Sequence, residues 1–81
     1  MKTKEKLASD LMGFLNSGYT DNEIENYVDE FEESFEDLCY EGDQLSLALY
    51  NLYQITGEMF TSDQLEDALD AIELTFNLKC E

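Results

Sequence analysis

The hydrophobic pattern of the chain predicts four amphipathic helices. Apolar residues recur mostly at intervals of three and four, the spacing of one face of an α-helix. Start and stop residues divide the pattern into four segments. The chain contains no Pro and only four Gly, so little in its composition interrupts a helix. The predicted helices run over approximately residues 4–15, 20–40, 44–57 and 61–78.

Three threonines mark expected helix starts. Thr3 precedes the first helix. Thr20 with Glu23, and Thr61 with Gln64, have the spacing of a capping box, in which each residue satisfies a backbone N–H of the other. The second and fourth helices are therefore expected to begin at Thr20 and Thr61.

The second and fourth segments also resemble one another as sequences. "YTDNEIENYVDEFEESF" aligns without a gap with "FTSDQLEDALDAIELTF" at an offset of 41, which pairs Phe35 with Phe76. This alignment favours an internal duplication into two tandem helical hairpins, 4–40 and 44–78. A hairpin leaves one apolar face open, and two hairpins can close on each other. We therefore predict one all-α domain over residues 1–81, a compact four-helix domain.

Charge changes this ordinary picture. Twenty Asp and Glu residues face four Lys, with no Arg and no His, for a net charge of −16. No basic residue occurs between Leu7 and Leu78. Solubility alone needs a net charge of only about 2 to 8 in a small domain. Nucleic acid and anionic membrane surfaces are therefore poor partners, whereas a basic protein surface is favoured.

A helical wheel of the second predicted helix separates its acidic residues from its apolar ones. The apolar arc spans roughly 140° and holds Ile24, Tyr27, Val28, Phe31, Ser34, Phe35, Leu38 and Cys39. As one helix, residues 23–41 would extend about 28 Å and carry roughly one carboxylate every 3 Å, close to the phosphate spacing of about 3.4 Å along a DNA strand. Five like-charge pairs at i,i+4 would cost roughly 1–2.5 kcal/mol together.

These acidic residues are the predicted partner-binding site. On the second helix the candidates are Glu25, Asp29, Glu30, Glu32, Glu33, Glu36 and Asp37, with Tyr40 as an aromatic anchor. The fourth helix repeats the acidic stripe in dilute form, with Glu66, Asp70 and Glu73 as further candidates. The pattern leaves open whether the two stripes are paired or separate.

Some apolar residues fall outside the main apolar faces. They are Leu47 and Tyr50 on the third helix, and Ala71, Leu74 and Leu78 on the fourth. One interpretation is that the third helix is central and buried on all sides. The alternative is a second apolar surface, through which Leu47, Tyr50, Leu74 and Leu78 form a homodimer or dock a partner.

The sequence does not favour an enzyme. Without His, neither a Cys–His pair nor a Ser–His–Asp triad can be formed, and the carboxylates are predicted on an exposed face. "DNEIENYVDEFE" lacks the Gly and ligand order of an EF-hand, and we expect no cofactor and no metal. The N-terminus lacks a signal-peptide pattern and no apolar run is of membrane-spanning length. We expect a cytoplasmic protein with Cys39 and Cys80 reduced and partly buried.

In class, the chain resembles the DNA-mimic inhibitors of phages and mobile elements, including anti-restriction and anti-CRISPR proteins. The resemblance rests on small size, excess acid with almost no base, and the acidic segment 23–41. It implies an inhibitor in the cytoplasm of a bacterial host, whose carboxylates meet Lys and Arg of a nucleic-acid channel in a defence enzyme. The alternatives are an immunity or antitoxin protein that neutralises a basic nuclease toxin, and a dimerising adaptor module.

Overall fold

All regular structure in the described part of the chain is helical. The computed structural model describes the backbone of residues 3–79 and the side chains of residues 3–77. The all-α prediction is confirmed, but there are five α-helices and a short 3-10 helix where four helices were expected. The elements are α1 (Lys4–Ser17), α2 (Asp21–Glu30), α3 (Glu32–Asp37), η1 (Leu38–Tyr40), α4 (Gln44–Thr56) and α5 (Ser62–Lys79).

The predicted helix starts are confirmed. The Thr20 hydroxyl accepts a hydrogen bond from the Glu23 N–H at 3.3 Å. The Thr61 hydroxyl accepts from the Gln64 N–H at 3.2 Å, and the Gln64 side chain accepts from the Thr61 N–H at 2.9 Å. The second pair is thus a complete capping box.

The second predicted helix is broken, which corrects the expectation of one straight helix over 20–40. At Phe31 the backbone has φ −112° and ψ 32°, and it separates α2 from α3. Tyr27, Phe31 and Phe35 recur at intervals of four, and a straight helix would stack these rings along one line. The Tyr27 ring still lies 5.0 Å from the Phe31 ring and 6.4 Å from the Phe35 ring. The Phe35 ring is fully buried and also packs 6.2 Å from the Tyr53 ring of α4, with planes only 11° apart.

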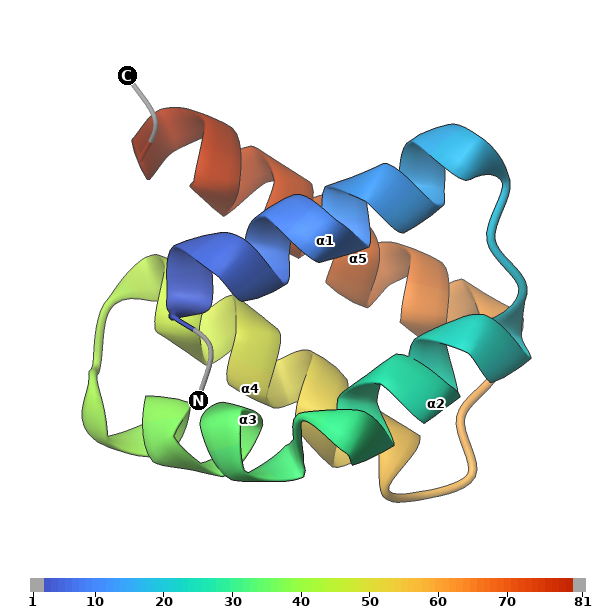
Figure 1. The fold of residues 1–81 in the computed structure, drawn as a ribbon, viewed down its shortest axis with the longest axis horizontal. Helices are drawn as coiled ribbons and strands as arrows, with labels where there is room; N and C mark the ends of the chain where they lie inside the picture. Colours follow the sequence, from blue (N-terminus) through green and yellow to red (C-terminus); the bar gives the residue numbers. More distant parts are fainter. Residues whose placement is uncertain (1–2, 80–81) are drawn as a thin grey trace.

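The helix α4 is at the centre of the fold. It contacts every other helical element, and its most extensive contact is with α5. Figure 1 shows α4 and α5 as an antiparallel pair, with α1 crossing them and α2 and α3 along the edge of α4. The radius of gyration is 11.4 Å, close to the roughly 12 Å expected of one folded domain of this length. The core is formed by side chains from all five α-helices, among them Leu7, Leu11, Ile24, Val28, Phe35, Leu49, Leu52, Leu65, Leu69 and Ile72.

The first expected hairpin is less regular than the second. The helix α1 packs chiefly on α4 and α5. It meets α2 through Tyr27, whose hydroxyl donates to Asp10 at 2.7 Å and whose ring lies 5.3 Å from Phe14. The internal duplication stays a prediction; its alignment pairs Phe31, where α2 ends, with Ile72, which lies inside α5.

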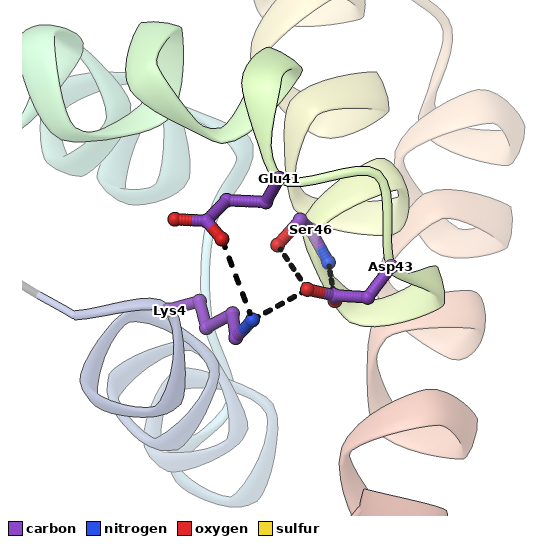
Figure 2. Close-up of polar contacts among 4 residues, drawn as sticks. All are labelled: Lys4, Glu41, Asp43 and Ser46. Atoms are coloured by element: carbon purple, nitrogen blue, oxygen red, sulfur yellow. Dashed lines mark hydrogen bonds and ion pairs between the residues drawn. The ribbon is translucent and has the colours of Figure 1, made fainter.

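Lys4 joins the beginning of α1 to the beginning of α4 (Figure 2). Its ammonium donates to the Asp43 carboxylate and lies 4.0 Å from Glu41. Asp43 is also the N-cap of α4, because it accepts from the Ser46 N–H at 2.9 Å and the Ser46 hydroxyl at 3.1 Å. These hydrogen bonds, that from Lys4 first, hold the pKa of the Asp43 carboxyl well below its usual value of 3.8.

Replacement of Asp43 by Asn is expected to destabilise the protein by about 1 kcal/mol at neutral pH. Asn still caps α4 but cannot pair with Lys4. Because the folded pKa is lowered, the ion pair contributes fully above about pH 4 and is lost as the pH falls. Urea unfolding should therefore separate the variant from the wild type most at pH 7. The difference should begin to narrow at pH 3 and close only as the pH approaches the lowered pKa of the folded state.

The matched control for Asp43→Asn is Glu58→Gln, which removes a carboxylate that is exposed. It should not lower the free energy of unfolding at either pH. Equal losses for Asp43→Asn at both pH values would contradict the assigned ion pair.

Candidate protein-binding surface

The acidic residues predicted on the second helix form one exposed surface. We use "acidic surface" for Glu25, Asp29, Glu30, Glu32, Glu33, Glu36 and Asp37 of α2 and α3, all of which are exposed. The apolar residues between them, Ile24, Tyr27, Val28 and Phe35, are buried. The predicted separation of exposed carboxylates from buried apolar residues is therefore confirmed for these residues, although the surface bends at Phe31.

Lys4 and Lys6, the lysines whose side chains the structure describes, pair with carboxylates outside the acidic surface. The Lys4 ammonium pairs with Asp43 and Glu41, and the Lys6 ammonium lies 3.4 Å from Asp10. These carboxylates all lie outside the acidic surface. Lys4 and Lys6 thus form these ion pairs with carboxylates that lie outside α2 and α3.

The break at Phe31 lowers the cost of this charge. Of the five expected like-charge pairs, Asp29–Glu33 spans the break and Asp37–Glu41 spans the 3-10 turn. Only three pairs remain within α-helices: Glu25–Asp29, Glu32–Glu36 and Glu33–Asp37. Their summed cost falls to roughly 0.6–1.5 kcal/mol.

Tyr53 of α4 reaches into the acidic surface. Its hydroxyl donates to Glu36 at 2.8 Å and lies 3.3 Å from a carboxylate oxygen of Glu32. The hydrogen bond to Glu36 raises the pKa of the Tyr53 hydroxyl, so it stays a donor. The sequence analysis missed Tyr53, because its pairing with α3 depends on a contact between residues 17 positions apart or more.

A pocket of about 570 Å³ lies where the acidic surface meets α4. The lining of the pocket combines carboxylates with uncharged residues, most of which belong to α4. The lining residues are Asp29, Glu32, Asn51, Tyr53, Gln54, Ile55, Thr56, Gly57 and Glu58. A second hollow of about 370 Å³ follows the break itself, over residues 29–34. Neither of these two hollows is lined by a cation, whereas a third, of about 330 Å³, has both Asp37 and Lys4 among its lining residues.

The acidic candidates of α5 lie elsewhere. Glu66 and Asp70 act on Tyr19, whose pKa is raised first by burial and then by these carboxylates and Asp21. Glu73 lines a small hollow with Met12, Leu15 and Asn16 of α1. None of the three lines the pocket beside Tyr53. The α5 carboxylates thus lie near α1 and the beginning of α2, and not at the α3 end of the acidic surface.

The apolar candidates divide into exposed and packed residues. Tyr40 is 86% exposed, Leu74 66% and Leu47 53%. Tyr50 is half-buried and packs against the core. The side chain of Leu78 lies outside the described residues. Leu47 corrects the interpretation that α4 is buried on all sides, since its outer face is open.

Cys39 is exposed, against the expectation that it is partly buried. The wheel assumed a continuous α-helix, but Cys39 lies in η1, where the break and the tighter 3-10 turn change the direction of side chains. Leu38 takes the buried position instead. Cys80 lies outside the described residues.

Two further observations concern alternative functions. Among residues 3–77, no group of three acidic or Cys side chains is arranged to hold a metal ion. In the described part of the chain, none of the helices combines the length and apolar character needed to cross a bilayer. Comparison of the chain with protein families, curated proteins and solved structures gives no match.

Proposed function

We propose that this protein is an acidic inhibitor that binds the basic nucleic-acid-binding surface of a host defence nuclease or another DNA-binding protein. It would act as a mimic of DNA phosphates, in the manner of anti-restriction and anti-CRISPR proteins. One observation carries the proposal. Seven exposed carboxylates follow α2 and α3, and the lysines described in the structure pair elsewhere.

The density of these carboxylates supports a phosphate mimic. From Glu25 to Asp37 the two helices extend about 18 Å, at about 1.5 Å per residue. Seven carboxylates over this distance give roughly one per 3 Å, and a DNA strand has one phosphate about every 3.4 Å. A groove with Lys and Arg spaced for DNA therefore meets a comparable density of negative charge.

The cost of the charge supports a role in binding. The three like-charge pairs lower the stability of a small domain, whose total is only about 5–15 kcal/mol. Lysines at alternate positions would turn these repulsions into attractions, and none is present. Repulsion within the free protein is relieved when a cationic surface covers it, so the same charges speed association and select the partner.

The proposal is tested by retention of DNA-binding proteins. The immobilised protein is incubated with the heparin-binding fraction of a bacterial lysate and then washed with competing duplex DNA. We expect it to retain nucleic-acid-binding proteins that the DNA releases. Glu30→Lys with Glu33→Lys should reduce retention at least about tenfold, because it reverses charge at the centre of the acidic surface.

A variant of equal charge provides the control. Asp63→Lys with Asp67→Lys changes two exposed residues of α5 and gives the same net charge of −12, from −16 plus 4. It should keep most of the retention. Equal losses in both variants would show non-specific attraction by net charge, and retained proteins that duplex DNA does not release would contradict mimicry.

A further inference from the structure

The helix α4 differs from the other α-helices because it contains no charged residue. Its sequence is QLSLALYNLYQIT, whereas α1, α2, α3 and α5 all contain carboxylates. On its outer side, residues at i, i+3, i+4 and i+7 form what we call the neutral stripe: Leu47, Tyr50, Asn51 and Gln54. Leu47, Asn51 and Gln54 are exposed, and Tyr50 is half-buried. Charge is therefore absent from the exposed face of the central helix in a protein of net charge −16.

The neutral stripe adjoins the acidic surface. The ring of Tyr50 lies 5.8 Å from that of Tyr53, whose hydroxyl is bonded to Glu36. Asn51 and Gln54 line the 570 Å³ pocket together with Asp29 and Glu32. An apolar and amide surface thus continues directly into a carboxylate surface, without a lysine among the residues that line the pocket.

This arrangement matches the anatomy of a protein interface. Interface centres are poor in charge and rich in aromatic residues, and their rims are polar. Buried apolar and aromatic anchors provide most of the affinity, while charged rims govern association and specificity. The neutral stripe fits the description of a centre, and the acidic surface that of a rim along one side.

The negative charge of the acidic surface favours a basic partner over a second copy of this chain. A second copy of this chain would bring two molecules of net charge −16 together beside two acidic surfaces, which like-charge repulsion opposes. A basic partner has no such cost. A guanidinium in the pocket could bond to Asp29 and Glu32 and stack on the Tyr53 ring, a geometry that Arg favours.

We propose that the neutral stripe is the contact centre for a basic protein, which places apolar side chains on Leu47 and Tyr50 and Arg side chains in the adjacent pocket. The inference rests on the proposed function and adds to it that charge alone does not provide the affinity. A DNA strand has no counterpart of the apolar contacts at Leu47 and Tyr50. The protein would therefore also contact residues of its target that do not bind DNA.

Two synthetic peptides of equal charge test the inference. One is an amphipathic helix with Leu on one face and Arg on the other; the second has every Leu replaced by Gln, which keeps helix propensity. Binding is measured by calorimetry and by shifts of backbone amides in NMR. We expect the Leu–Arg peptide to bind at least about tenfold more tightly, with shifts at Leu47, Asn51 and Gln54 as well as in α3.

Two matched variants locate the apolar contact. Leu47→Ser should remove most of the difference between the peptides. Leu74→Ser, at the other strongly exposed Leu among residues 3–77, should leave this difference unchanged. Both residues are outside the core, so both variants are expected to fold.

The outcomes that overturn the inference are distinct. If both peptides bind equally and shift only α2 and α3, the neutral stripe is not the centre, although binding of cations by the acidic surface stands. If neither peptide binds, the proposed function fails as well. If the free protein self-associates through α4 and Leu47→Ser abolishes this, the occupant is a second copy.

Discussion

Replacement of Phe35 by Ala is expected to destabilise the protein by about 3–5 kcal/mol, a large share of the stability of a small domain. Phe35 is fully buried. Its ring stacks on Tyr53 of α4 and meets the edge of Tyr27 at 6.4 Å. Truncation would open a cavity between α3 and α4, and the break at Phe31 would lose the packing that directs α3 inward. Chemical denaturation monitored by circular dichroism measures the loss.

The matched control is Phe76→Ala. Phe76 is the residue that the internal alignment pairs with Phe35, but it is only partly buried. Removal of a partly buried ring costs less transfer energy and leaves a smaller cavity, so we expect about half the effect of Phe35→Ala. Equal losses of unfolding free energy in the two variants would contradict the assignment of Phe35 as fully buried and Phe76 as only partly buried.

The beginnings of the helices were predictable because they depend on neighbours in the chain. Thr20 and Thr61 each bond to a residue three positions later, and such local geometry can be read from the spacing alone. The break at Phe31 has no such local cause, since neither Gly nor Pro is present there. It accompanies the packing of Phe35 on Tyr53, a contact between residues distant in sequence.

In the candidate site, too, features set by local helix geometry were predictable, whereas features set by contacts distant in sequence were not. The exposure of each acidic residue follows from its angle on a helix, so the exposure of these seven carboxylates was predicted correctly, while their role in binding stays a prediction. Its concave shape was not, because the pocket forms only where α4 lies beside α2 and α3. Cys39 was placed wrongly, because its angle was calculated on a helix that does not continue through η1.

The helix α4 is central in the fold but is not buried on all sides. It is central, since it contacts every other helical element, yet Leu47 is 53% exposed on its outer side. The absence of charge from residues 44–56 was visible in the sequence. Its significance depends on which residues surround the helix, and only the fold places Asn51 and Gln54 beside carboxylates.

Added salt is expected to stabilise the free protein by about 1–2 kcal/mol between about 0.01 M and about 1 M NaCl, which corresponds to roughly 5–15 °C in melting temperature. The Debye length falls from about 30 Å to about 3 Å over this range. Screening therefore relieves repulsion within the acidic surface and across the whole chain of charge −16. The Lys4–Asp43 pair is weakened at the same time, but only 18% of the Lys4 side chain is exposed, and partly buried pairs are screened less.

Two controls separate screening from other effects of salt. Glu33→Gln with Asp37→Asn removes one like-charge pair and two exposed carboxylates, so it should be more stable than the wild type at low salt and respond less to NaCl. Choline chloride of the same ionic strength should act like NaCl, because screening does not depend on the identity of the cation.

Binding should respond to salt in the opposite direction. The carboxylates that repel one another in the free protein attract the Lys and Arg of its partner, and salt weakens both interactions. Retention of DNA-binding proteins should therefore fall over the range in which the melting temperature rises. A melting temperature that is flat or falls with salt would show that the charges of α2 and α3 are already compensated within the protein, and the physical basis for a cationic partner would be lost.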